Sequence, residues 1–474
     1  MQMISIVFLL LTGLILILLG LTNRIVKQDS RKVLLSKWIL LAASFAFAAY
    51  GDIRFALVLG LISLVSWAAA RSPGAIPLGI VFDLLALGYF KYTNFFLENL
   101  GRLFGGQIHV VRLLLPLGIS FYTFSAVSYL VDVKRGKLQP ASLLDVALYL
   151  SFFPKLTSGP IQRSGDFFLQ MSRPRKVSFQ SFGDGCQIFA FGLFKKLVLA
   201  DRLSVLVNQV YLTPRAFDSL TVLLAVLSYS LQLYFDFSGY SDMAIGVGRM
   251  LDVDLPRNFN LPYLSHNITE FWKRWHITLS SWLQDYLYIP LGGSRRGKIR
   301  AYRNLILTMV IGGLWHGASW NYVLWGLLNG LGLMVHKLFV SGRKEKKYNL
   351  LTNTLSVLMT FCFVSFTWIF FRAETPEKAL LILTQLFSFR GGVRHLYVWL
   401  FAALVLYLLS AVLAAIRSKN LAGTQKKKNT SCVEAFYPHF DLTSFWGLTL
   451  FFVFCGLILG LAYTGGSPFI YGGY

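Results

Sequence analysis

Long apolar stretches separated by short basic loops make up most of this 474-residue chain. A helix needs about 20 apolar residues to cross a bilayer core about 30 Å thick, and shorter runs can be completed by flanking residues or by tilt. The pattern therefore predicts an all-α, polytopic membrane protein with about eleven transmembrane helices plus re-entrant and interfacial helices. The charge-free stretches of full length are 3–22, 113–131, 219–235, 304–336, 348–371, 396–416 and 442–474, and the shorter runs are 38–51, 55–70, 73–82 and 185–194.

The loops between apolar runs carry most of the basic residues, which predicts a sidedness for the chain. Lys and Arg beside membrane helices resist translocation, so loops rich in them remain in the cytoplasm. With residues 24–37 inside, the chain begins outside, the loop 372–395 falls outside, and the last residues, 465–474, emerge on the outer face. Both termini are therefore predicted on the outer side. The basic clusters are 24–37, 134–137, 173–176, 295–303, 337–347 and 417–428.

Composition agrees with a lipid environment and excludes other classes. Apolar residues make up 55% of the chain and charged residues 14%, against about 25% charged in soluble proteins. The net charge of +24 lies in loops beside membrane helices, which argues against nucleic-acid binding. The four cysteines show no zinc or disulfide spacing, so no metal site is predicted. The first 22 residues lack a basic start and a cleavage site, which favours a membrane helix over a removed signal peptide.

Residues 304–336 do not fit a single crossing. Both flanking loops are basic and should be cytoplasmic, so the chain must enter the membrane and return. We expect a hairpin of two short or re-entrant helices, with breaks at Gly312-Gly313 and at Gly317. His316 is the thirteenth residue of this stretch and can lie up to about 20 Å deep.

Residues 256–300 predict a helix that lies in the membrane interface or dips from it. Asn267 and Glu270 resemble a capping box, and charged residues interrupt any full span. The aromatic content is typical of the interface. The apolar and aromatic positions that recur at helical spacing are Trp272, Trp275, His276, Leu279, Leu283 and Tyr286.

Ionisable residues inside a membrane domain are costly and are functional candidates by default. His316 in G-G-L-W-H-G-A-S-W is the first, and Trp315 and Trp320 beside it could wall an apolar tunnel. His276 in W-K-R-W-H-I-T-L-S is the second. Each histidine also has a structural alternative: a neutral imidazole bonded between helices for His316, and a ring at head-group level for His276.

Asp236 and Asp242 in Y-F-D-F-S-G-Y-S-D-M-A form the third candidate. They are six residues apart and would face different sides of one helix, which Gly239 is expected to break. Capping, or pairing with a buried arginine such as Arg249 or Arg257, is the expected role. Catalysis by a carboxylate with a raised pKa is the alternative.

The other templates for chemistry are missing from the sequence. It has no Walker-type phosphate loop, no H-E-x-x-H motif and no G-x-S-x-G nucleophile elbow, and no bound cofactor is predicted. Phosphoryl transfer needs metal-binding carboxylates and a phosphate cradle, whereas an imidazole suits a general base that takes a hydroxyl proton. Imidazoles in a Trp- and Gly-lined membrane cavity therefore indicate acyl transfer.

Five motifs resemble those of the membrane-bound O-acyltransferases. They are P-K-L-T-S-G-P-I-Q-R (154–163), L-Q-L-Y-F-D-F-S-G-Y-S-D-M-A-I-G (231–246), R-N-F-N-L-P-Y-L-S (257–265), T-E-F-W-K-R-W-H-I-T-L-S-S-W-L-Q-D-Y-L-Y-I-P-L-G-G (269–293) and G-G-L-W-H-G-A-S-W-N-Y-V-L-W-G (312–326). The chain is most similar to the bacterial branch that O-acetylates exported polysaccharides such as alginate and peptidoglycan. The organisation expected from the resemblance is N-terminal membrane helices (1–109), an acyltransferase core (110–375), and C-terminal membrane helices with an outer-face aromatic tail (376–474).

The resemblance implies a site. His316 would be the catalytic histidine and His276 the second active-site histidine, and both would line a central tunnel through the membrane. The candidates for tunnel or substrate contacts are Trp315, Trp320, Trp275, Asp236 and Asp242. The last eight residues read S-P-F-I-Y-G-G-Y; Tyr471 matches a suspected acyl carrier of this branch, whereas the family's aromatic residues after it are replaced.

The resemblance also implies substrates and partners. The donor is expected to be a cytoplasmic acyl-CoA, in the first place acetyl-CoA. The chain itself is expected in the inner membrane of a bacterium, in contact with membrane lipids. The acceptor is a polysaccharide at the outer face, reached with a periplasmic or extracellular SGNH-hydrolase-like partner. Two alternatives remain: a proton-coupled transporter or flippase with His316, Asp236 and Asp242 as a relay, and a non-catalytic scaffold for envelope assembly.

Overall fold

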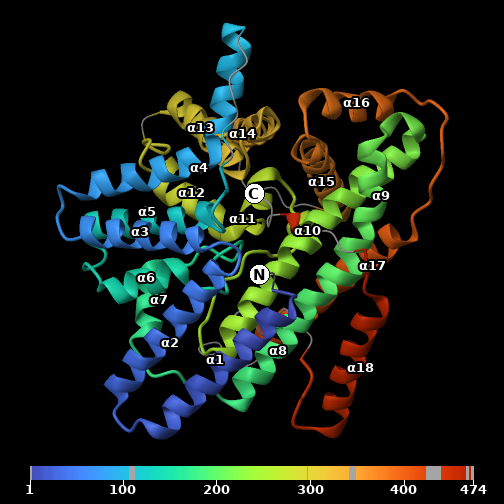
Figure 1. Ribbon diagram of the computed structural model, residues 1–474. Coiled ribbons are helices and arrows are strands. Elements are labelled where there is room, and N and C mark those ends of the chain that lie inside the picture. The colour runs from blue at the N-terminus through green and yellow to red at the C-terminus, as the bar shows by residue number, and fades with distance from the viewer. Residues whose placement is uncertain are drawn as a thin grey trace. The chain divides into compact units, whose positions relative to one another are not determined.

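The protein is described by a computed structural model that covers residues 3–105, 111, 113–295, 297–340, 349–422, 439–465 and 469–470. These residues are mostly helical (Figure 1), and in this part of the chain the extended structure is limited to one isolated bridge between Phe217 and Val393. The all-α, polytopic fold predicted from the apolar pattern is therefore confirmed.

Seven of the described helices are long and apolar enough to cross a membrane. The predicted count of eleven is not confirmed, because several apolar runs form shorter helices or share their helix with charged residues. α3 (Ile53–Ala69) and α18 (Phe445–Leu461), for example, are apolar but have 17 residues each. The seven candidates are Ile6–Ile25, Asp29–Ala49, Ile76–Phe104, Ser219–Met250, Trp320–Phe339, Leu350–Arg372 and Val398–Ile416.

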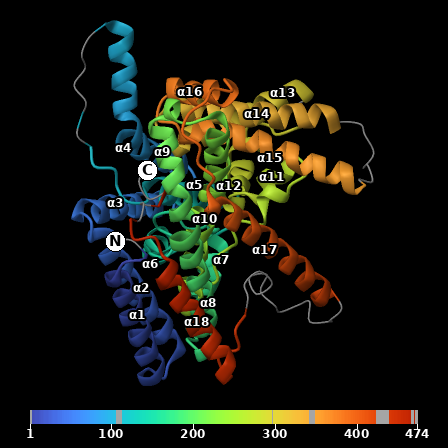
Figure 2. The same ribbon diagram turned by 90° about the vertical axis from the view of Figure 1, so that its right-hand side faces the viewer.

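The described residues fall into two compact units, and the first comprises residues 1–186 and 244–256. In it α1 and α2 lie side by side as an antiparallel pair in both views (Figures 1 and 2). The first family motif forms a buried turn in which the Lys155 ammonium lies 4.0 Å from the ring centre of Tyr149. The helices are α1 (Ile6–Ile25), α2 (Asp29–Ala49), α3 (Ile53–Ala69), α4 (Ile76–Phe104), α5 (Ile119–Lys134), α6 (Leu143–Ser151), α7 (Ser164–Met171) and the start of α8 (Phe179–Leu193).

The second unit comprises residues 187–243 and 257–473, as far as they are described, and contains both histidine motifs. Its α-helices are the end of α8, α9 (Asp201–Leu212), most of α10 (Ser219–Met250), α11 (Ile268–Arg274), α12 (Ile277–Leu283), α13 (Lys298–His316), α14 (Trp320–Val340), α15 (Leu350–Arg372), α16 (Pro376–Phe387), α17 (Val398–Ala422) and α18 (Phe445–Leu461). Two π-helical segments, η1 (Phe194–Ala200) and η4 (Gln284–Tyr288), and two 3₁₀ turns, η2 (Pro214–Ala216) and η3 (Pro262–Leu264), connect them.

The long helix α10 is continuous through Gly239, so the predicted break at this glycine is wrong. A Cβ atom at Gly239 would lie 2.8 Å from the carbonyl oxygen of Gly192, and one at Gly192 would lie 2.5 Å from the oxygen of Gly239. The two glycines therefore let α8 and α10 approach at backbone distance. The glycine serves close packing rather than helix termination.

Residues 304–336 form the predicted hairpin, built from α13 and α14, which lie side by side in both views (Figures 1 and 2). The break at Gly317 is confirmed, but the break at Gly312-Gly313 is wrong, because α13 continues to His316. A Cβ at Gly313 would lie 2.1 Å from the carbonyl oxygen of Tyr322. This glycine therefore brings the two helices of the hairpin into contact.

Candidate active site

His316 is the last residue of α13 and is buried, with 4% of its surface exposed. The helix ends there because residue 317 leaves the helical conformation, and a Cβ at Gly317 would lie 2.2 Å from the ring of Tyr322. The carbonyl end of a helix carries partial negative charge and stabilises a protonated histidine by about 0.3–1 kcal/mol or more. The imidazole of His316 therefore lies at the carbonyl end of α13.

Aromatic rings surround the imidazole of His316. Its ring centre lies 5.0 Å from that of Trp315, 5.2 Å from that of Trp325 and 5.2 Å from that of Phe371, with interplanar angles of 75° to 86°. Such edge-to-face contacts fix the ring orientation. The aromatic rings exclude bulk water from the imidazole, and their π-electrons can interact favourably with a cation.

His276 lies between α11 and α12, which corrects the prediction of one continuous interfacial helix. Asn267 caps α11 as expected, since its side chain accepts the Glu270 N–H. The helix then ends at Arg274, and His276 adopts the left-handed conformation with φ 42° and ψ 53°. This conformation costs a non-glycine residue about 1–2 kcal/mol and concentrates at functional sites. The spacing of apolar residues could not reveal the break.

Asn258 holds His276 in place and selects its tautomer. The Asn258 side-chain oxygen accepts the Thr278 N–H at 3.2 Å and the Thr278 hydroxyl at 2.9 Å, and Nδ1 of His276 lies 3.1 Å from the same oxygen. Nδ1 must therefore carry the proton, which leaves the lone pair on Nε2. Burial lowers the pKa of His276 to about 3, so the ring is neutral at physiological pH.

Trp315 links the two histidines. Its ring centre lies 6.3 Å from that of His276 and 5.0 Å from that of His316. Trp275 is buried and lies 5.1 Å from Trp368, whereas Trp320 begins α14 with half of its surface exposed. The structure therefore brings His276, His316 and Trp315 together and places Trp320 at a more open position.

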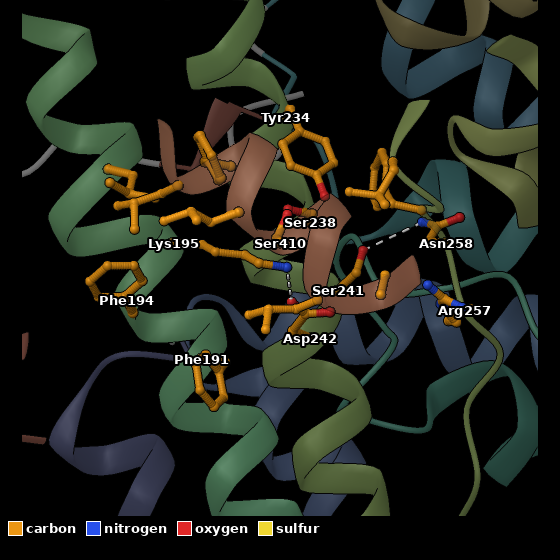
Figure 3. Close-up of a pocket in the computed structure, with 18 residues that line it drawn as sticks. Phe191, Phe194, Lys195, Tyr234, Ser238, Ser241, Asp242, Arg257, Asn258 and Ser410 are labelled. Atoms are coloured by element: carbon orange, nitrogen blue, oxygen red, sulfur yellow. Dashed lines mark hydrogen bonds and ion pairs between the residues drawn. The ribbon is translucent and has the colours of Figure 1, made fainter. Parts of the chain in front are cut away.

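A cavity of about 280 Å³ has Asn258, the hydrogen-bond partner of His276, as part of its wall (Figure 3). Its lining is mainly apolar and includes leucines of α17. Lys195, Asp242 and Arg257 add charged groups, and serines add hydroxyl groups. In Figure 3 Lys195 extends toward Asp242, and Ser241 contacts the Asn258 amide at 3.5 Å. The cavity suits a molecule with an apolar body and polar or anionic groups.

Asp236 and Asp242 pair with lysines, which the sequence reasoning missed. Lys196 contacts Asp236 at 2.7 Å, and Lys195 forms an ion pair with Asp242. The expectation of a partner at Arg249 is wrong, because Arg249 pairs with Asp184 and Asp254. The missed signal is the Lys-Lys pair inside the apolar run F-G-L-F-K-K-L-V-L-A.

Two further predictions concern Tyr471 and the absence of a metal site. Tyr471, the proposed acyl carrier, lies outside the described residues. Within the described ranges, no group of three or more His, Cys, Asp or Glu side chains is arranged to hold a metal ion.

Comparison with known proteins assigns this chain to a family. The model of the MBOAT, membrane-bound O-acyltransferase family matches residues 62–373, a range that includes both histidines. The resemblance inferred from the motifs is therefore confirmed.

Curated relatives give the same result. The chain is 41% identical over 370 residues to the "Probable alginate O-acetylase AlgI" of Pseudomonas aeruginosa, covering 74% of this chain and 69% of the relative. It is 38% identical over 396 residues to the peptidoglycan O-acetyltransferase of Helicobacter pylori, covering 75% and 74%. A teichoic acid D-alanyltransferase of Streptococcus thermophilus is 29% identical over 280 residues, covering 54% and 68%.

Proposed function

Because the chain belongs to the membrane-bound O-acyltransferase family, we propose that it moves an acyl group, in the simplest case acetyl, from a cytoplasmic donor toward hydroxyls of a cell-envelope or exported polysaccharide. That it is a multi-pass membrane O-acyltransferase follows from the family and the apolar helices. The polysaccharide acceptor is suggested by the alginate and peptidoglycan acetylases among its relatives. The observation that carries the proposal is His316, buried at the end of α13 among aromatic rings.

His316 acts as the general base. It takes the proton of the attacking hydroxyl as the hydroxyl oxygen bonds to the carbonyl carbon of the thioester. When the carbon–sulfur bond breaks, the imidazolium returns this proton to the departing sulfur. The helix terminus and the neighbouring rings favour the transient imidazolium, and the small exposed surface of His316 limits hydrolysis of the thioester.

His276 has a different role, because its Nδ1 proton is committed to Asn258. The neutral ring can accept a hydrogen bond at Nε2 from the donor or from the acceptor hydroxyl. Its contact with Trp315 keeps it next to His316. We assign it to substrate orientation rather than to proton abstraction.

The cavity beside Asn258 is suited to an acyl-CoA donor. Its walls combine leucines with Lys195 and Arg257, and its volume of about 280 Å³ is of the size that accepts part of a small molecule. It lies along the part of α17 that leads to the basic residues 417–428, which the charge pattern places in the cytoplasm. Entry from this side keeps the bulky nucleotide of CoA out of the membrane.

The acceptor side is the outer face of the bacterial inner membrane, on which both termini are proposed to lie. Transfer onto the polysaccharide would be completed there by an SGNH-hydrolase-like partner, with Tyr471 as the candidate intermediate carrier. The transporter alternative required a relay through Asp236 and Asp242. Both carboxylates are engaged by lysines, and the family supports acyl transfer.

The proposal is tested with membrane vesicles that contain the protein and receive acetyl-CoA labelled in its acetyl group on the cytoplasmic face. Acyl transfer predicts release of free CoA together with label in the protein or the acceptor, and loss of both in H316Q. A transporter or scaffold predicts an intact thioester. Equal CoA release in wild type and H316Q would overturn the assignment of the base.

A further inference from the structure

A buried charge cluster joins Asp236 of α10 to Lys196 of η1 and Asp201 of α9. Asp236 directly precedes Phe237, whose ring contacts His276. The Lys196 ammonium lies 2.7 Å from Asp236 and 2.9 Å from Asp201, and the three side chains are no more than 2% exposed. The cluster therefore holds two carboxylates and one ammonium group. Buried charge is costly unless hydrogen bonds compensate it, so a further donor to Asp236 stabilises the cluster.

That donor comes from the C-terminal segment. The Ile470 N–H donates to Asp236 at 2.8 Å. The preceding Phe469 is 5% exposed, and its ring centre lies 4.5 Å from the Lys196 ammonium and 5.0 Å from the ring of Tyr240. Residues 469–470 thus supply a hydrogen bond to the anion and an aromatic face to the cation of the same ion pair.

The π-helical segment η1 provides a second attachment for the same part of the chain. A π-helical turn interrupts the regular hydrogen-bond pattern of the α-helices around it. The Leu197 carbonyl in η1 accepts the Tyr463 N–H at 3.1 Å, and Arg202 donates to the Leu461 carbonyl at 3.2 Å. Residues 461 and 463 are therefore bonded to Arg202 and to η1, respectively.

The attachment lies deep along α10. Asp236 is 17 residues after Ser219, the first residue of the helix, which corresponds to about 26 Å along its axis. The helix as a whole is about 48 Å long. Next to Asp236, the ring of Phe237 lies 4.6 Å from that of His276 in an edge-to-face contact. The same turn of α10 therefore contacts the C-terminal segment and the second histidine.

We propose that the Lys196–Asp236 pair is an intramolecular docking site for residues 469–470, and that Asp236 is a positioning residue that holds these two residues beside the active site. The catalytic relevance of this docking rests on the proposed function, whereas the docking itself does not. Asp236 is then neither a proton relay nor a catalytic carboxylate. Its ion pair orients the carboxylate so that the second oxygen can bind the Ile470 N–H.

Hydrogen exchange of the purified full-length protein, measured by mass spectrometry on the peptide that covers 462–474, tests the docking without an acyl donor. We expect D236A to accelerate exchange at Ile470 about tenfold or more, because a charge-assisted hydrogen bond is lost. D242A is the matched control. It breaks the Lys195–Asp242 ion pair, which also involves α10, and should leave the exchange rate of this peptide unchanged.

F469A is a second variant, which keeps the test decisive if D236A fails to fold. It retains the charge cluster and removes the aromatic ring over Lys196. We expect it to accelerate hydrogen exchange at Ile470 as well. Unchanged exchange in D236A and F469A, or equal acceleration in D242A, would overturn the docking site. Intact docking in a protein without acyltransferase activity would instead contradict the proposed function alone.

Discussion

The side-chain oxygen of Asn258 lies 3.1 Å from Nδ1 of His276 and also accepts the backbone N–H and hydroxyl of Thr278. This relationship fixes the orientation of a histidine whose backbone is in the left-handed region. It also leaves Nε2 of His276 as the acceptor, which is the role we propose for this ring beside His316 as the general base.

We expect N258A to lower acyl transfer about tenfold or more, because His276 loses its oriented tautomer and Thr278 loses an acceptor. H276A should be impaired but retain residual turnover. The double variant should be no worse than H276A, since both changes act through one ring. Initial rates of the single and double variants check this; independent, multiplicative losses would show that Asn258 acts elsewhere.

Stability should depend on pH through His276. Burial lowers its pKa to about 3, while the unfolded chain takes up a proton near pH 6.5. The unfolded state therefore binds more protons between these values, and the free energy of unfolding falls as the pH drops below about 6.5, by up to about 1.4 kcal/mol per pH unit.

This dependence is measured as the midpoint of thermal unfolding between pH 7.5 and pH 5, in wild type and in H276Q. The wild-type midpoint should fall more steeply toward acid than that of the variant. An equal decrease in both proteins would assign the acid sensitivity to other groups.

The hairpin of α13 and α14 should not tolerate a methyl group at residue 313. In G313A the new Cβ would lie 2.1 Å from the Tyr322 carbonyl oxygen, and the helices would have to separate and displace His316. We expect loss of folded protein by size-exclusion chromatography. G456A is the control, because no atom lies within 4 Å of a Cβ there; normal folding of G313A would contradict the packing argument.

The sequence predicted the helical class and the hairpin, because apolar run lengths are local signals. It also singled out both histidines as ionisable residues in a membrane domain, and their catalytic roles stay predictions. It did not predict the roles of Gly239 and Gly313. A glycine in a helix reads as a weak point, and only the neighbouring helix shows that it serves close packing. The break before His276 was missed because Asn258, which stabilises it, lies 18 residues earlier.

The charge pairs were missed for a related reason. Asp236 lies 40 residues from Lys196, and Asp242 lies 47 residues from Lys195. A spacing of this length has no signature in a single sequence. The Lys-Lys pair inside an apolar run is the signal that would have indicated anionic partners for both lysines.

Tyr471 as acyl carrier remains a prediction from the resemblance. Y471F keeps an aromatic anchor and removes the nucleophilic oxygen, so it should abolish polysaccharide acetylation. Trapping with labelled acyl donor should place the label on the C-terminal peptide of the wild type. Wild-type acetylation in Y471F, with no label on that peptide, would exclude the carrier role.

The central claim is that His316 is the general base of acyl transfer. Its most direct test is the acetyl content of the envelope polysaccharide in cells whose sole copy of the protein is wild type, H316Q or H336Q, at matched membrane levels. His336 is the control, since it lies in the same hairpin and contacts Thr269 at 2.8 Å. We predict a loss of about 10²–10⁴ in rate and no detectable acetylation for H316Q, with acetylation retained in H336Q. Wild-type acetylation in the H316Q cells would contradict the account.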